Sequence, residues 1–225
     1  MDISVEERKS DSEISSPSWA FIHTPYYCEE NVYFLCKKLI ADGIADGDGA
    51  DLFVVFISNG RKQVPLWRQR VSSRADGAVV WDYHVICIQK RKDAGSAHLV
   101  WDLDATLLLP SPLTSYLSEV VRTSTHVFPE YRRYFRVVHA PLFMRSFASD
   151  RSHMRDKSGE WMAPPPPYDP IKSEDGSMNN LPDYMEINGH DVMSIDDVGV
   201  IDVLFQRSLG VVLAEHNLHE LFSLI

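Results

Sequence analysis

Residues 79–104, VVWDYHVICIQKRKDAGSAHLVWDLD, decide the fold and carry the first sign of a functional site. Two runs rich in Val, Ile, Trp and Tyr flank the polar segment 90–96, which contains a glycine. This pattern predicts two antiparallel strands joined by a short loop. Because side chains alternate between the two faces of a strand, we expect His84 to share a face with Asp82, and Trp81 to lie on the opposite face.

The register of this hairpin decides which acid faces His84. A loop centred on Asp93 puts His84 directly across from Asp102. A loop centred on Ala94 puts it across from Asp104 instead. Direct cross-strand neighbours are about 5 Å apart at Cβ, so either register places an imidazole beside a carboxylate. The pair is either a buried polar pair that satisfies its own hydrogen bonds, or a general base held in one tautomer, which requires a nucleophile elsewhere in the chain.

The nucleophile that the sequence offers is Cys28. A helix that ends at Gly43 is predicted by apolar residues at the spacing i, i+3, i+4, i+7 and i+8, namely Val32, Leu35, Cys36, Leu39 and Ile40. Cys28 then lies at the helix N-terminus, where the dipole and free N–H groups stabilise a thiolate. Glu29 and Glu30 in the first turn oppose thiolate formation, so a nearby protonated histidine would help. The other two cysteines lie on apolar faces and are interpreted as core residues.

The composition limits the class of protein and the place where it acts. The chain has 225 residues and a net charge of −10, which argues against a partner that is a nucleic acid or an anionic membrane surface. The N-terminal segment lacks the apolar core of a signal peptide, and no run approaches the ~20 apolar residues of a membrane span. We expect a cytoplasmic monomer with reduced thiols, with the nucleus left open as a second location. The histidines and cysteines lack metal-ligand spacing, so we expect no metal and no other cofactor.

The rest of the chain predicts an α+β fold. Residues 52–58 have a strong strand pattern, and residues 61–70 have a second one, in which Pro65 favours an edge strand or a bulge. A fifth strand is predicted at 135–139, and an apolar face predicts a short helix over 113–122. The short connections favour a mostly antiparallel sheet with helices packed on it.

Seven motifs follow one another along the chain: YYCEEN, VFISN, WDYHV, DLD, FRV, FASDRSHM and PPPPY. In this order they closely resemble the protein N-terminal glutamine amidohydrolases, over roughly residues 26–199. The resemblance implies hydrolysis of the side-chain amide of an N-terminal Gln on a protein or peptide, giving N-terminal Glu and ammonia for the N-degron pathway. It implies a papain- or transglutaminase-like core with Cys28, His84 and Asp102 as the catalytic residues, and therefore the register centred on Asp93.

Selectivity for a chain terminus requires recognition of the α-ammonium group, for which a carboxylate or carbonyl groups in a closed pocket are suited. Asp82, which neighbours His84, and Asp150, in the FASDRSHM loop, are the candidates for this role. Trp81 is a candidate for the pocket wall, with core packing as the alternative. The backbone N–H of Cys28 is a candidate oxyanion donor.

Three parts are expected along the chain. Residues 1–18 are rich in charge and Ser and predict disorder. Residues 19–199 form a single catalytic domain, and residues 200–225 form a divergent tail, because the resemblance ends at Gly199. Two alternatives to the amidohydrolase stay open: a cysteine protease or transglutaminase-like acyl transferase with the same residues, and a non-catalytic binder of N-terminal Gln if the tail disables the chemistry.

Overall fold

A six-stranded sheet forms the centre of the computed structural model, which describes residues 21–92, 96–123 and 127–225. The strand order is β6-β5-β4-β1-β7-β8, and all neighbouring strands are antiparallel. This confirms the predicted α+β fold with a mostly antiparallel sheet. The disorder predicted for residues 1–18 lies outside the described residues. The strands of the sheet are β1 (Leu52–Ser58), β4 (His84–Gln89), β5 (Leu99–Trp101), β6 (Ser111–Pro112), β7 (Tyr134–His139) and β8 (Val211–Ala214).

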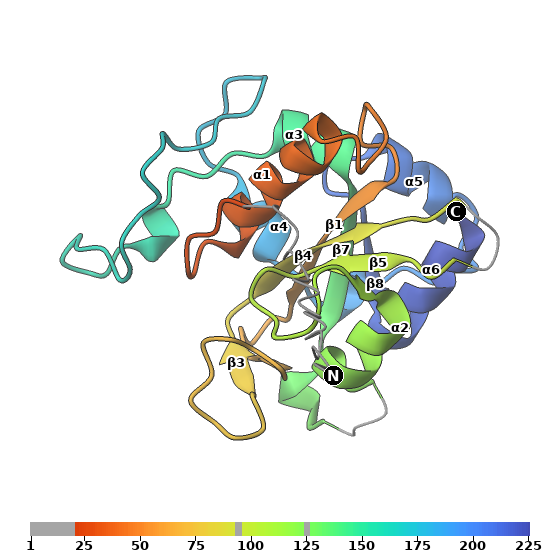
Figure 1. Ribbon diagram of the computed structural model, residues 1–225, viewed down its shortest axis with the longest axis horizontal. Helices are drawn as coiled ribbons and strands as arrows, with labels where there is room; N and C mark the ends of the chain where they lie inside the picture. The colour runs from red at the N-terminus through yellow and green to blue at the C-terminus, as the bar shows by residue number, and fades with distance from the viewer. Residues whose placement is uncertain (1–20, 93–95, 124–126) are drawn as a thin grey trace, which may run out of the picture.

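Helices cover both faces of this sheet (Figure 1). One face carries α1 (Cys28–Ala41), α3 (Ala140–Ser146) and α4 (Leu181–Met185). The other face carries α2 (Leu113–Tyr116) with the π-helical turn Leu117–Val121, and also α5 (Val200–Gln206) and α6 (Leu218–Leu224). Single 3₁₀ turns lie at Pro129–Tyr131, Ser152–Met154, Gly189–Asp191 and Glu215–Asn217. Among the described residues, no helix combines the length and the apolar character that a membrane crossing requires.

The central strand β1 shows why two cores form. All seven of its residues are buried, because helices lie above and below it. Val54 and Phe56 face the core under α1, whereas Phe53 and Val55 face the core under α5 and α6. An uninterrupted apolar strand is therefore explained by burial on both faces of the sheet.

The single strand predicted over residues 79–89 is wrong. The strand is interrupted at Asp82 and Tyr83. Oδ1 of Asp82 accepts a hydrogen bond of 2.9 Å from the backbone N–H of Tyr83. Such local side-chain bonds to the backbone compete with a strand ladder. Upstream of the break, β3 (Val79–Trp81) pairs with β2 (Val64–Leu66) in a separate two-stranded sheet. Downstream of it, β4 joins the main sheet. The strand predicted over 61–70 is likewise shortened to the three residues of β2.

The register of β4 and β5 also differs from the expectation drawn from the family resemblance. Cys87 pairs with Trp101, and Ile88 pairs with Val100. These pairs belong to the second register, the one that would place Asp104 opposite His84. The ladder ends at Trp101, however, and the chain turns immediately afterwards. Strand pairing therefore does not decide which acid reaches His84.

Residues 200–225, expected as a divergent tail, form α5, β8 and α6. The strand β8 pairs with β7 at the edge of the sheet. Leu204, Leu221 and Phe222 are buried in the core on that face. Glu215 forms an ion pair with the buried Arg133, with Oε2 and the guanidinium nitrogen 2.7 Å apart. The segment thus closes one edge of the sheet and one of its two cores.

Candidate active site

The first residue of α1 is Cys28, as the sequence predicts. The loop before the helix is tied to its first turn by two hydrogen bonds with Asn31. The backbone N–H of Thr24 donates to Asn31 Oδ1, and Asn31 Nδ2 donates to the carbonyl of Thr24, each at 2.8 Å. Tyr26 has a φ of 71°, a left-handed conformation that turns the chain sharply into the helix. These constraints hold Cys28 at the helix N-terminus, with 7% of its surface exposed.

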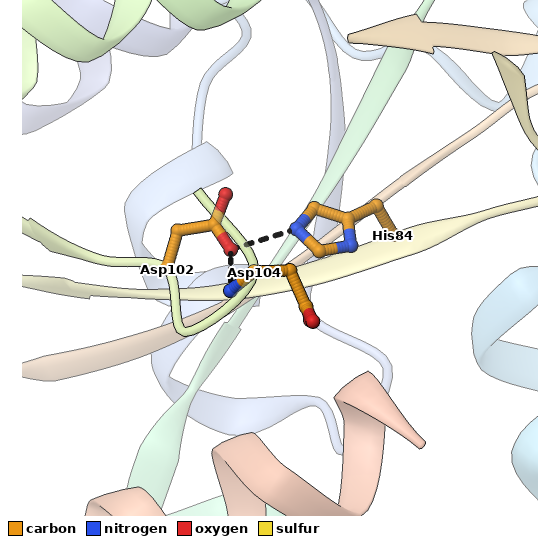
Figure 2. A group of neighbouring side chains, drawn as sticks. All are labelled: His84, Asp102 and Asp104. Carbon is orange, nitrogen blue, oxygen red and sulfur yellow. Dashed lines mark hydrogen bonds and ion pairs between the residues drawn. The ribbon is translucent and has the colours of Figure 1, made fainter. Parts of the chain in front are cut away.

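His84 and Asp102 form a buried hydrogen-bonded pair (Figure 2). Nε2 of His84 and Oδ1 of Asp102 are 3.0 Å apart. The same oxygen accepts the backbone N–H of Asp104 at 2.9 Å. The hydroxyl of Tyr116 donates to the other oxygen, Oδ2, at 2.8 Å. Asp102 is therefore the acid that bonds to His84, because the turn after β5 brings its carboxylate back toward the imidazole.

Each member of this pair stabilises the charged form of the other. Burial disfavours imidazolium, but the charge and the hydrogen bond of Asp102 outweigh it and raise the pKa of His84. Burial also disfavours the carboxylate, but the charge of His84 and the bonds from His84 and Tyr116 lower the pKa of Asp102. Nδ1 of His84 is buried and has no hydrogen-bond partner among the described residues. Since Nε2 is held by Asp102, Nδ1 is the nitrogen that can exchange a proton with another group.

The surroundings of the Cys28 thiol disfavour the thiolate. Burial raises the pKa of Cys28 well above its ordinary value, and the negative charges of Glu29, Asp104 and Asp82 raise it further. The backbone N–H of Val85, the residue that follows His84, acts in the opposite direction and lowers it. The thiol therefore lies beside the start of β4, where burial and the nearby carboxylates favour its protonated form.

Glu29 lies in the first turn of α1, as the sequence predicts, and is fully buried next to the thiol. Its Oε2 lies 3.8 Å from Sγ of Cys28 and accepts a hydrogen bond of 2.8 Å from the hydroxyl of Tyr83. Its Oε1 lies 3.6 Å from Nε2 of His153 and has no hydrogen-bond partner among the described residues. Burial raises the pKa of Glu29 to about 7.

A cavity of about 340 Å³ opens over the thiol. The residues that line it are Tyr26, Cys28, Trp81, Asp82, Tyr83, Asp104, Met154, Met162 and Ala163. Asp82 thus lies in the cavity wall, whereas Asp150 does not belong to the lining. Asp150 is exposed, and its Oδ1 accepts a hydrogen bond of 2.9 Å from the backbone N–H of Ser152.

The prediction that Trp81 lies on the opposite face from His84 is wrong. The two rings stack, with centroids 5.3 Å apart and an interplanar angle of 19°. The strand break at Asp82 explains the difference, because strict alternation of faces holds only within one continuous strand. Trp81 therefore both lines the cavity and covers the imidazole.

His84, Asp102 and Asp104 form a cluster of metal-type donor atoms, which lie within 4.8 Å of one another. One donor atom of each residue bonds to a protein group, whereas Nδ1 of His84 has no partner among the described residues. His84 bonds to Asp102, and Oδ1 of Asp104 lies 2.8 Å from Nε2 of His23. Hydrogen bonds link His84, Asp102, Asp104 and His23 into one network.

A second buried pair, Arg151 and Glu30, ties α1 to the rest of the domain. Arg151, in the FASDRSHM motif, donates two hydrogen bonds to the buried Glu30, at 2.8 and 2.9 Å. Its third bond, of 3.3 Å, goes to the carbonyl of Pro166 in the PPPPY motif. Sequence reasoning missed this pair, as it missed Tyr116, because a buried charge has no local signature in the sequence. The FASDRSHM and PPPPY motifs thus hold α1 in place.

Comparisons with known proteins show the family of the chain. The profile of the family described as N-terminal glutamine amidase matches residues 23–222. A protein N-terminal glutamine amidohydrolase of Arabidopsis thaliana is 53% identical over 210 residues, which cover 93% of this chain and 95% of the relative. A protein of the same name from Homo sapiens is 38% identical over 177 residues, covering 77% of this chain and 82% of the relative. The chain therefore belongs to the N-terminal glutamine amidase family.

Proposed function

We propose that this protein is an N-terminal glutamine amidohydrolase that converts an N-terminal Gln of proteins or peptides to Glu and releases ammonia. The observation that carries the proposal is the buried Cys28 at the N-terminus of α1, with its thiol next to the backbone N–H of Val85, in a chain of the amidase family whose strand β4 begins with the buried, Asp102-bonded His84. We further propose that this core is of the papain and transglutaminase type. The enzyme acts as a cytoplasmic monomer in the N-degron pathway.

The first half-reaction forms a thioester. The proton of the Cys28 thiol moves to Nδ1 of His84, and Sγ attacks the carboxamide carbon of the substrate. The C=O electron pair moves onto oxygen and then returns as the C–N bond breaks. His84 gives its proton to the departing nitrogen, which leaves as ammonia. Asp102 keeps the imidazole in the required orientation through Nε2 and stabilises its cationic form.

The second half-reaction uses water. His84 takes a proton from a water molecule as its oxygen attacks the thioester carbon. The C–S bond then breaks, Sγ recovers a proton, and the product leaves with a Glu side chain. The backbone N–H of Cys28, at the N-terminus of α1, is the oxyanion donor in both halves, because no helical carbonyl partners it there.

Recognition of the chain terminus falls to the cavity over Cys28. Asp82 is the group that binds the α-ammonium, since it lines this cavity and is exposed there, while Asp150 lies outside the lining. Trp81 forms the wall and covers the imidazole of His84. A cavity of about 340 Å³ suits one side chain with its ammonium group better than an extended chain that passes through.

Ammonia release from matched peptides tests the proposal. The peptides begin with Gln, with Asn or with acetylated Gln, and each is incubated with the wild type and with Cys28→Ala. We expect release from free N-terminal Gln alone, and only when Cys28 is present. Cleavage of a peptide bond or transfer of the acyl group to an amine would instead indicate a protease or an acyl transferase. Binding of the Gln peptide without turnover would indicate a non-catalytic binder.

A further inference from the structure

The cavity over Cys28 is acidic. Two of the residues that line it are aspartates, Asp82 and Asp104, and none of its lining residues is Lys, Arg or His. Beneath the thiol, Oε2 of the buried Glu29 lies 3.8 Å from Sγ. A nucleophile that must become an anion is therefore surrounded by three carboxylates.

Titratable groups from four parts of the fold surround the Cys28 thiol. The first turn of α1 contributes Glu29, and the segment between β3 and β4 contributes Asp82 and Tyr83. The turn after β5 contributes Asp104, and α2 contributes Tyr116, which lies farther away behind Asp102. The histidines near these groups are His84, which begins β4 next to Val85, His23, which bonds to Asp104, and His153, which lies 3.6 Å from Glu29.

Each of the three carboxylates is already partly compensated by a neighbouring group. Asp104 bonds to His23 through one oxygen, and Asp82 accepts the backbone N–H of Tyr83. Glu29 accepts the hydroxyl of Tyr83 through Oε2, and its Oε1, which has no hydrogen-bond partner among the described residues, lies 3.6 Å from Nε2 of His153. The charges of all three carboxylates raise the pKa of the Cys28 thiol.

We propose that the α-ammonium group of the substrate activates the nucleophile: bound beside Asp82, it balances the carboxylates around Cys28 and lets the thiol proton move to Nδ1 of His84. The inference rests on the proposed function. The step itself transfers one proton from sulfur to nitrogen and breaks no other bond. The free enzyme keeps a protonated thiol of low reactivity, and the thiolate forms when a cationic chain terminus enters the cavity.

This mechanism places the selectivity for a free terminus in the chemical step. A Gln side chain without an adjacent ammonium enters the cavity and meets a protonated thiol. Each unit by which the bound ammonium lowers the thiol pKa increases the thiolate fraction about tenfold at neutral pH. An ammonium that served only as a binding contact would change KM and leave kcat unaltered.

The test compares the ionisation of Cys28 with and without the ammonium group. In the free enzyme, the rate of alkylation of Cys28 by iodoacetamide is measured against pH, with the modified peptide quantified by mass spectrometry. In the complex, the acid side of the kcat profile reports the same ionisation. Two substrates are used: a Gln peptide, and its des-amino form, in which hydrogen replaces the α-ammonium.

For the Gln peptide we expect the acid-side midpoint of kcat to lie about one pH unit or more below the alkylation midpoint of the free enzyme. The des-amino peptide should lose about tenfold or more in kcat, with its midpoint returned to that of the free enzyme. Coincident midpoints for the Gln peptide and the free enzyme would overturn the inference, as would a des-amino peptide that changes KM alone. The proposed function fails separately, if the Gln peptide releases no ammonia at any pH.

A pair of variants tests the contribution of the buried acid. Glu29→Gln removes the charge next to the thiol, so the alkylation midpoint of the free enzyme should fall and the advantage of the Gln peptide over its des-amino form should shrink. The matched control, Glu174→Gln, changes an exposed side chain and should leave both quantities unchanged. An unaltered midpoint in folded Glu29→Gln contradicts the role of this acid. If that variant does not fold, the comparison of substrates on the unaltered chain still decides the inference.

Discussion

Replacing Asp102 by Asn changes one charge in the site and almost no volume. Asn retains a carbonyl oxygen that can accept the hydrogen bond from Nε2 of His84, which is 3.0 Å from Oδ1 in the wild type. It no longer offers a negative charge to an imidazolium. We therefore expect the pKa of His84 to fall, because the charge and hydrogen bond of Asp102 are what raise it against the effect of burial.

The geometry sets the size of the effect. Unit charges about 4 Å apart attract each other by about 4 kcal/mol at the effective dielectric constant of about 20 that suits protein sites. Each 1.36 kcal/mol lost from transition-state stabilisation lowers the rate about tenfold. Because the dipole of Asn recovers part of the attraction, we expect kcat of Asp102→Asn to fall by about 10²- to 10³-fold.

The assay is ammonia release from a Gln peptide across a range of pH, with Tyr116→Phe as the matched control. This control substitution removes the hydroxyl that donates to Oδ2 and keeps the carboxylate, so the variant should lose less than about tenfold in kcat. A kcat and pH profile of Asp102→Asn equal to those of the wild type would refute the assignment of Asp102 as the group that stabilises the cationic imidazole.

Three further predictions concern stability. Arg151→Met leaves the buried Glu30 unpaired and should lower the free energy of unfolding in urea by about 3–5 kcal/mol. The double variant with Glu30→Gln should recover part of this loss. An unchanged free energy of unfolding in Arg151→Met would count against the pair. The pKa of Glu29 is about 7 in the folded chain, against an ordinary value of 4.5. The folded state therefore binds this proton more tightly than the unfolded state does. The stability that results is fully present below pH 4.5 and is lost as the pH rises through 7. The unfolding free energy of the wild type relative to Glu29→Gln should therefore fall by about 3 kcal/mol across that window, and a difference independent of pH would contradict this. Leu221→Ala should cost about 2–5 kcal/mol in α6, while the exposed Leu224→Ala costs little; equal melting temperatures would show that the segment is not part of the core.

Local patterns in the sequence predicted the parts of the site that short-range physics controls. The apolar spacing of α1 and its acidic first turn located Cys28 at a helix N-terminus, and the β-branched run of β1 predicted the central strand. The pairing of an imidazole with a carboxylate followed from the hairpin, because both candidate registers place an acid beside His84.

Long-range packing controls the parts that could not be predicted. Alternation of faces assumes one continuous strand, so the break at Asp82 reversed the expected position of Trp81 relative to His84. The turn after β5 brings the carboxylate of Asp102 to His84, although the observed strand register would place Asp104 opposite His84. Buried charges such as Arg133 depend on partners about 80 residues distant in the sequence, as its bond to Glu215 shows. Nothing in a window of sequence identifies such partners.

Covalent trapping is the most direct test of Cys28 as the nucleophile that attacks the side chain of an N-terminal Gln. A peptide whose first residue is the diazoketone analogue of glutamine places an alkylating carbon where the carboxamide would lie. After incubation, peptide mapping by mass spectrometry locates the label, with a Gln peptide as the protecting competitor. The account predicts loss of ammonia-releasing activity together with one label on each chain, at Cys28. A label at another residue of the inactivated enzyme, or inactivation that the Gln peptide does not slow, would contradict it.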